Sequence, residues 1–268
     1  MASEALKQAM AELAASGEAP QLEELPASKL GTKDHWDGVY AREVKMFKEI
    51  GDEGEVWFGE DSAQDMVEWA EEHFPQQDGR ILDLGTGNGQ LLFAFSKAGY
   101  TSLTGVDYSS LSIELAQSIL SARLAAVSSS DDDEADNDAP SLASPPPRFF
   151  VADILDIGLG KDVEGVTGKG EQWDLVTDKG TYDAVCLSDE TRDGQSLREL
   201  YVATVSRLLP KDGLFLITSC NWTQAELEKA FVSEKTGLEV HSNIPRASFQ
   251  FGGATGSTIT TVAFVKKV

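Results

Sequence analysis

Several kinds of residue are scarce in this chain, and each shortage excludes a class of protein. Only two cysteines and three histidines occur in 268 residues. Cys186 and Cys220 lie far apart in the sequence, without the close spacing of zinc ligands, so they indicate a reduced intracellular protein and no metal site. Lys and Arg number 22 against 45 Asp and Glu, a formal net charge of -23. Because neutralising phosphates needs excess positive charge, this balance argues against direct nucleic-acid binding and favours a basic protein partner.

Long apolar runs are also missing. No stretch approaches the roughly 18 uncharged apolar residues that a membrane-spanning helix requires. Glu4 and Lys7 stand where a signal peptide would have an apolar segment. We therefore expect a cytoplasmic protein without a membrane-bound part. A monomer with one large core is the simplest expectation for this length.

Two segments differ in composition from the rest. Residues 1–30 are rich in Ala and Glu and predict a flexible N-terminal extension. Residues 128–147 hold six acidic residues, four prolines and no basic residue. Such a segment cannot bury enough apolar surface to order itself, so it predicts a disordered insertion. The remaining chain, residues 31–268, is expected to form one domain interrupted by this insertion.

The densest pattern lies between residues 80 and 95. An apolar strand over 80–84 runs into a turn and then into a helix whose apolar positions recur at helical spacing. The turn contains three alternating glycines, which are Gly85, Gly87 and Gly89. Glycine adopts backbone angles that side chains resist and lets a ligand lie against bare main chain. The three glycines are therefore candidate ligand contacts.

The residues around the turn indicate which ligand it holds. Gln90 stands where the dinucleotide fingerprint has its third glycine. Asp83, ahead of the glycines, would repel a pyrophosphate and attract an amino group. The next strand ends at Asp107, from where a carboxylate accepts both hydroxyls of a ribose. Tyr108 follows directly and is a further candidate contact. The pattern favours a zwitterionic ligand that also carries a ribose.

These residues resemble motif I of the class I S-adenosylmethionine-dependent methyltransferases. Residues 148–154 are interpreted as the third strand and its exit, and in a sheet of that kind such an exit lies beside the glycine turn. Asp153 is then placed to accept a hydrogen bond from an adenine amino group, and Ile154 to cover a ring face. The alternative is that Asp153 only caps the next turn.

Aromatic residues cluster in two segments ahead of the glycine turn. Trp36 and Tyr40 lie four apart in a predicted helix that Thr32 begins. Trp57 and Phe58 are adjacent and precede a glycine, which is typical of a lid rather than of core packing. An aromatic face stabilises a sulfonium cation by about 0.5–2 kcal/mol. Packing against the core and closing over a cofactor remain open alternatives for the helix.

A second dense segment covers residues 172–184. An apolar strand ends at Asp178, and a Lys-Gly-Thr turn leads to Tyr182 and Asp183. All of these are expected at the carboxyl edge of the sheet, where a substrate would meet the cofactor.

Five segments together resemble the eukaryotic elongation factor 1-alpha lysine methyltransferase family, over roughly residues 30–266. They are Gly31-Thr32 with His35-Trp36-Asp37, Trp57-Phe58-Gly59-Glu60, Asp178 to Ala184, Thr218 to Thr223, and Phe249 with Phe251-Gly252-Gly253. The resemblance implies an α/β fold with a seven-stranded Rossmann-like sheet of order 3-2-1-4-5-7-6, helices on both faces and an antiparallel last strand. It also implies S-adenosylmethionine as cofactor and a lysine of translation elongation factor 1-alpha as substrate.

The expected roles of the site residues follow from this interpretation. Asp178 would orient the lysine amine and offset the charge of the sulfonium, and only secondarily accept a proton. Tyr182 is the second candidate catalytic residue and, like Asn221, Trp222 and Phe251, a candidate substrate contact. The candidate cofactor contacts are Trp36, Trp57, Phe58, Asp83, Gly85, Gly87, Gly89, Asp107, Tyr108, Asp153, Ile154 and Asp178.

Rival functions stay open at this point. Motif I is shared by methyltransferases that act on other proteins or on small molecules. A nicotinamide-dependent oxidoreductase is disfavoured by Gln90 and Asp83. A module that binds the cofactor without catalysis is a third alternative.

Overall fold

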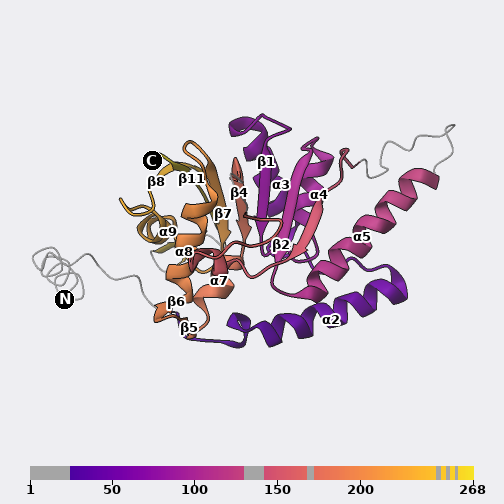
Figure 1. Ribbon diagram of the computed structural model, residues 1–268, viewed down its shortest axis with the longest axis horizontal. Coiled ribbons are helices and arrows are strands. Elements are labelled where there is room, and N and C mark those ends of the chain that lie inside the picture. Colours follow the sequence, from indigo (N-terminus) through magenta and orange to yellow (C-terminus); the bar gives the residue numbers. More distant parts are fainter. Residues whose placement is uncertain (1–24, 130–141, 168–171, 246–248, 252–253, 257–258) are drawn as a thin grey trace, which may run out of the picture.

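The computed structural model describes residues 25–129, 142–167, 172–245, 249–251, 254–256 and 259–268. A seven-stranded sheet of order β3-β2-β1-β4-β7-β11-β8 forms its centre (Figure 1). Numbered by their order along the chain, these strands run 3-2-1-4-5-7-6, as predicted. The strand β11 pairs antiparallel with both of its neighbours, while the pairings from β3 to β7 are parallel. The predicted fold class is therefore confirmed.

The elements alternate between strands and helices for most of the chain. The strands of the sheet are β1 (Arg80–Leu84), β2 (Ser102–Asp107), β3 (Arg148–Val151), β4 (Leu175–Lys179), β7 (Leu214–Ser219), β8 (Leu238–Ile244) and β11 (Thr260–Lys266). The helices are η1 (Lys29–Gly31), α2 (Lys33–Ile50), α3 (Gly59–His73), α4 (Gln90–Lys97), α5 (Ser110–Ser129), α6 (Leu155–Gly158), α7 (Thr181–Cys186), α8 (Leu197–Leu208) and α9 (Gln224–Phe231). Two short hairpins, β5 (Thr191–Arg192) with β6 (Gln195–Ser196) and β9 (Phe249–Phe251) with β10 (Ala254–Gly256), complete the described elements.

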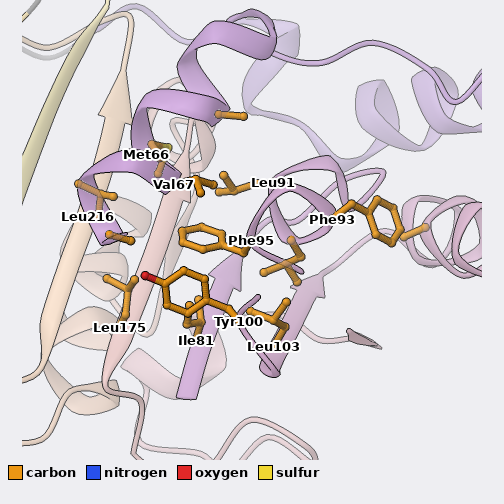
Figure 2. Packing of buried hydrophobic residues seen from close by; sticks show 14 of the residues in the cluster. Met66, Val67, Ile81, Leu91, Phe93, Phe95, Tyr100, Leu103, Leu175 and Leu216 are labelled. Carbon is orange, nitrogen blue, oxygen red and sulfur yellow. The ribbon is translucent and has the colours of Figure 1, made fainter. Parts of the chain in front are cut away.

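The sheet divides the core into two apolar layers. Alternate residues of a strand point to opposite faces, so Ile81 packs with the first layer and Leu82 with the second. The first layer takes its helical residues from α2, α3, α4 and α5. Figure 2 labels members of this layer from α3 and α4. The second layer takes its helical residues from α6, α7, α8 and α9. Both faces of the sheet are thereby covered, as expected for strands that are apolar along their whole length.

The described ends of the predicted N-terminal extension and of the predicted acidic insertion pack against the domain. Residues 1–24 and 130–141 lie outside the described residues, so most of both predicted segments is not covered. From the first segment, the amide of Ser28 donates to the carbonyl of Leu187 at 2.9 Å. From the second, the amide of Ala143 donates to Ser96 Oγ at 2.9 Å, and α5 continues to Ser129. The described edges of both segments are thus ordered parts of the fold.

Across the described residues, every helix falls short of the combination of length and apolar character needed to cross a membrane.

Candidate functional site

A cavity of about 370 Å³ opens where β1, β2, β3, β4 and β7 lead into their following turns. This volume is in the range of about 300–1,000 Å³ that is usual for small-molecule sites. We call one part the glycine half; it is lined by Gly85, Gly87, Asp107, Tyr108, Asp153 and Ile154. We call the opposite part the α7 half; it is lined by Gly180, Thr181, Asp183, Cys220 and Asn221.

The turn after β1 presents bare backbone to the cavity. Gly87 has φ +57, and a Cβ on it would lie 2.7 Å from Tyr40 Oη. Gly85 has φ +66, and its Cβ would collide with the side chain of Thr181 at 2.1 Å. No side chain fits at either position, because the backbone of the turn lies directly against Tyr40 at Gly87 and against Thr181 at Gly85. Gly89, which was predicted to touch the cofactor, instead begins α4 against the ring of Phe149 and does not line the cavity.

Asp107 joins the ends of β1 and β2. Its Oδ2 accepts from the Gly87 amide at 3.1 Å, and its Oδ1 accepts from the Ser109 amide at 2.8 Å. Burial raises the pKa of Asp107 to about 6, although these hydrogen bonds oppose the shift. Each carboxylate oxygen has two lone pairs, so both can accept a further bond from the cavity. The neighbouring Tyr108 also lines the cavity, with Lys33 Nζ 5.7 Å from its ring centroid.

Asp153 caps the next turn and also lies at the cavity. Its Oδ1 accepts from the Leu155 amide at 3.0 Å and so begins the turn into α6. The carboxylate also lines the cavity, next to Ile154. Its Oδ2 is ion-paired with Arg192 at 2.6 Å, a residue of the β5–β6 hairpin. The 39 residues between these partners explain why no sequence pattern reveals the pair.

Asp83 lies beneath the glycine turn and does not line the cavity. Its exposure is 3%, and its Oδ1 accepts from Thr177 Oγ1 at 2.8 Å. Burial raises the pKa of Asp83 to about 6, while hydrogen bonding and the charge of Lys179 oppose that shift. Its influence on a ligand is therefore electrostatic, exerted through the turn and not by direct contact.

Lys179 is a cavity residue that the sequence interpretation missed. Burial lowers the pKa of its amine, and the carboxylates of Asp83 and Asp178 counteract this. Its Nζ donates to the carbonyl of Trp57 at 2.8 Å. It thereby ties the end of β4 to the aromatic segment above the cavity.

Asp178 is buried at the end of β4 and does not reach the cavity. Its Oδ1 accepts from the Thr181 amide at 2.8 Å, and its Oδ2 accepts from the Tyr182 amide at 2.8 Å and from the Tyr201 hydroxyl. Burial raises the pKa of Asp178 to about 7. The carboxylate thus begins α7, and this geometry does not provide the predicted contacts with a cofactor or an amine.

Tyr182 and Trp222, predicted to meet the substrate, lie in the second core layer. Their exposures are 1% and 4%, and their ring centroids are 6.2 Å apart. Successive residues of a helix project about 100° apart, so Tyr182 faces the core while the next residue, Asp183, faces the cavity. The sequence predicted Tyr182 and Asp183 at the same carboxyl edge. Only the orientation of α7 shows that the first faces the core and the second the cavity. Asn221 does line the α7 half, whereas the side chain of Phe251 lies outside the described residues.

Aromatic residues from two segments form a wall of the cavity. The rings of Trp36 and Trp57 meet edge to face with centroids 5.0 Å apart, and Trp36 Nε1 donates to the carbonyl of Leu30 at 2.7 Å. Phe58 lines the same wall and has φ +62, an uncommon angle for a residue with a side chain. A Cβ on Gly180 would lie 3.0 Å from its ring. The predicted lid is therefore packed directly on the turn after β4.

Polar contacts fix this lid, residues 52–58, to the glycine turn. Asn88 Nδ2 donates to the carbonyls of Glu53 and Glu55 at 3.0 and 3.2 Å. The Glu53 carboxylate accepts from Gln90 Nε2 at 2.7 Å and is ion-paired with Arg123 of α5. Gln90, which breaks the dinucleotide fingerprint, thus helps to hold the lid.

Comparison with known proteins identifies the family of the chain. A family model described as a methyltransferase domain matches residues 58–243. Protein-lysine N-methyltransferase efm4 of Schizosaccharomyces pombe is 42% identical over 254 residues, covering 90% of this chain and 95% of its own. The human EEF1A lysine methyltransferase 2 is 36% identical over 239 residues, covering 89% and 87% of the two chains.

Solved structures agree on the fold. The [4+2]-cyclase SpnF has a TM-score of 0.58 at 11% identity, covering 92% of this chain and 100% of that one. A TehB-like SAM-dependent methyltransferase from Corynebacterium glutamicum has a TM-score of 0.51 at 19% identity, covering 88% and 100%. The chain therefore belongs to the family of S-adenosylmethionine-dependent methyltransferases that contains protein-lysine N-methyltransferase efm4 and EEF1A lysine methyltransferase 2.

Proposed function

We propose that this chain transfers a methyl group from S-adenosylmethionine to a lysine side chain of translation elongation factor 1-alpha. The observation that carries the proposal is the single cavity that joins the glycine half to the carboxylate-bearing α7 half. The names of relatives that align over 85–97% of their own length support the choice of substrate.

The residues of the glycine half fit the cofactor. Gly85 and Gly87 present bare backbone to the cavity, and a Cβ on either would collide with Thr181 or Tyr40. Asp107 retains acceptor capacity for the ribose hydroxyls, and Asp153 with Ile154 stands where an adenine edge and face would lie. The aromatic wall is suited to a sulfonium, which aromatic faces attract. These side chains are therefore assigned to holding the cofactor.

Three of the predicted cofactor contacts support the site from outside the cavity. Asp83 places negative charge under the glycine turn, Gly89 allows the backbone to enter α4, and Asp178 begins α7. They act on the ligand through the backbone that they hold. Tyr182 and Trp222 pack the core behind α7 and have no contact with substrate in this proposal.

The chemistry makes two demands on the protein. The bound cofactor supplies an electrophilic methyl group on a positively charged sulfur. The chain must hold the lysine nitrogen in line with this group, at about 3 Å, and keep water away. It must also obtain a neutral amine, which costs about 4–5 kcal/mol at neutral pH for a lysine with the usual pKa near 10.4. The aromatic wall of Trp36, Trp57 and Phe58 meets part of the second demand only by excluding water, because desolvation disfavours the ammonium form, whereas its ring faces attract either cation.

The charge and the cysteine content of the chain support a basic protein substrate and a cytoplasmic location. The net charge of -23 suits a basic protein substrate and disfavours direct contact with nucleic acid. The low cysteine content suits the cytoplasm, and we propose that the enzyme acts there as a monomer.

The proposal is tested by incubating the purified protein with methyl-labelled S-adenosylmethionine and purified elongation factor 1-alpha. Label is expected on one lysine of the factor, which mass spectrometry locates, and S-adenosylhomocysteine is expected to suppress it. Label that enters other proteins or small molecules of a cell extract but not the factor would contradict the substrate assignment. Calorimetric titration with NAD and S-adenosylmethionine separates the oxidoreductase alternative, because only the latter is expected to bind.

A further inference from the structure

Five acidic residues line the cavity, and their surroundings differ. Asp107 is bonded to the backbone of the glycine half, and Asp153 is ion-paired with Arg192. Glu55 and Glu190 are exposed at the rim. Asp183, on the wall of the α7 half, is 5% exposed, and no basic side chain of the described residues forms an ion pair with it. Asp107 and Asp183 are thus the two buried carboxylates of the cavity without an ion-pair partner among the described residues, and only Asp183 lies in the α7 half.

We propose that Asp183 binds the ammonium group of the target lysine in the α7 half and takes its proton before methyl transfer. This inference rests on the proposed function, and it replaces Asp178 as the carboxylate that meets the amine. Asp183 is one helical position beyond Tyr182 and projects to the cavity side of α7.

The carboxylate is held in a defined orientation with spare acceptor capacity. Its Oδ1 accepts from Ser219 Oγ at 2.5 Å, and its Oδ2 accepts from the Cys220 amide at 2.8 Å. Each oxygen has a second lone pair that can accept from an ammonium group. Ser219 is itself fixed, because its Oγ accepts from the amides of Asn221 and Trp222 at 3.2 and 3.1 Å. The turn after β7 thus positions Asp183 beside the cavity-lining Cys220 and Asn221.

Burial gives this carboxylate the properties that the reaction needs. Desolvation raises the pKa of Asp183, and the hydrogen bonds from Ser219 and Cys220 oppose this only in part. A buried carboxylate without a cation is unfavourable, and an entering ammonium group removes that cost. A raised pKa also lies closer to neutral pH and makes the carboxylate a stronger base, which favours it as a proton acceptor.

The step balances without a further reactant. The ammonium group gives one proton to the Asp183 carboxylate, which leaves a neutral amine and a neutral carboxyl group. The amine lone pair then forms the nitrogen–methyl bond while the methyl–sulfur bond breaks, and its electron pair stays on sulfur. The methylated product leaves as an ammonium ion, and the carboxyl group of Asp183 then releases its proton to solvent, which restores the carboxylate.

Other titratable groups near Asp183 come from three elements. They are Asp178 of β4, Cys186 of α7 and Cys220 after β7. Burial raises the thiol pKa values to about 12 and 11, so both cysteines stay neutral between pH 6 and 9. Asp178, with a pKa of about 7, is the one neighbour that titrates in that range, and its ionisation disfavours a charge on Asp183.

The test is Asp183→Asn in the full-length enzyme, assayed on elongation factor 1-alpha between pH 6 and 9. We expect kcat to fall about 100-fold or more, as for loss of a general base, with the KM for S-adenosylmethionine within twofold of wild type. We also expect the residual rate to rise more steeply with pH, because the amine must then lose its proton unaided. A variant with kcat within threefold of wild type and an unchanged pH profile would overturn the inference.

Ser219→Ala is the matched control for a purely structural role. It removes the hydrogen bond to Asp183 and loosens the turn after β7, but it keeps the carboxylate. A structural role predicts that both variants lose activity alike and keep the wild-type pH profile, which would overturn the inference. We expect Ser219→Ala to lose less activity and to shift the acid limb of the pH profile to higher pH, because the hydrogen bond that opposes the raised pKa of Asp183 is removed.

The wild-type enzyme provides a measurement if Asp183→Asn does not fold. Calorimetry in buffers of different ionisation enthalpy gives the protons released when a peptide with the methylated lysine binds to the S-adenosylhomocysteine complex. We expect no net release at pH 7.5, because the proton stays on the enzyme; release of about one proton per peptide would overturn the inference. If wild-type enzyme does not methylate elongation factor 1-alpha at all, the proposed function fails instead, and the two failures are thereby distinct.

Discussion

The turns after β1 and β4 look alike in sequence but serve the cavity differently. Each follows an apolar strand with an acid near its end, contains glycine, and opens a helix. After β1 the bare backbone of Gly87 reaches the cavity, and after β4 a helical side chain, Asp183, does so. The acids within the strands, Asp83 and Asp178, are both buried and hold the surrounding structure. An acid near a strand end is therefore a poor guide to ligand contact unless the direction of its side chain is known.

The largest effect is expected from Gly87→Ala. The new Cβ would lie 2.7 Å from Tyr40 Oη at a left-handed φ of +57, so it obstructs the cavity as well as straining the turn. We expect the Kd for S-adenosylmethionine to rise at least about 100-fold, or roughly 2.7 kcal/mol. Calorimetric titration measures this.

Gly51→Ala is the control for Gly87→Ala. Gly51 also has a left-handed φ, +75, but nothing lies within 4 Å of a Cβ there. The control should lose about 1 kcal/mol of unfolding free energy and keep its affinity for S-adenosylmethionine. Equal loss of affinity in both variants would mean that backbone strain, and not obstruction of the cavity, is responsible.

The pH dependence of the unfolding free energy should reflect the buried carboxyl groups near the ends of β1, β2 and β4. Burial raises the pKa values of Asp83, Asp107 and Asp178 to about 6, 6 and 7. The folded state then holds protons more tightly than the unfolded state, so this contribution is largest below pH 4 and is lost as the pH rises through 6–7. We expect the unfolding free energy to fall by about 1–3 kcal/mol between pH 5.5 and 8.

Affinity for the cofactor should change in the opposite direction. Binding to Asp107 requires an ionised acceptor, so the thermal shift produced by S-adenosylmethionine should be greater at pH 8 than at pH 5.5. Thermal unfolding with and without the cofactor at the two pH values measures both effects. A stability that rises towards pH 8 would show that these carboxylates are not protonated in the folded protein at pH 5.5.

Tyr201→Phe tests whether Asp178 has a structural role only or also takes part in the reaction. It removes one of the three donors to the buried Asp178 carboxylate, which should cost about 1–3 kcal/mol of unfolding free energy. For a chain of this size that corresponds to a fall in Tm of several degrees. Below the transition we expect kcat within threefold of wild type, because Asp178 does not line the cavity.

Tyr100→Phe is the matched variant for Tyr201→Phe. The Tyr100 hydroxyl is also buried, but it donates to a neutral carbonyl, that of Phe74, at 2.9 Å. It should therefore lose less stability. A large loss of kcat in Tyr201→Phe with an unchanged Tm would restore Asp178 to a direct part in the reaction.

The same contrast explains what the sequence alone could predict. The glycine turn and the position of Asp107 follow from patterns within about 30 residues, the strand order follows from the resemblance to a known family, and the described structure agrees with all three. The direction of a side chain on α7 does not follow from such a pattern, because it depends on how Asp178 and Tyr201 orient that short helix. Contacts between distant segments, such as Arg123 with Glu53 over the lid, leave no pattern in a single sequence.

The smallest effect is expected at Asp153, the acid that lies after β3. Arg192→Met removes its ion pair, whose side chains are both about one-third exposed, and such pairs contribute about 0.2–1 kcal/mol. Asp153 would then be less well oriented, and we expect the KM for S-adenosylmethionine to rise no more than about fivefold. Lys161→Met, which breaks the exposed pair with Asp156 outside the cavity, should leave this KM unchanged. A lower KM in Arg192→Met would instead mean that Arg192 competes with the cofactor for the carboxylate, so that Asp153 serves the ligand more than the fold.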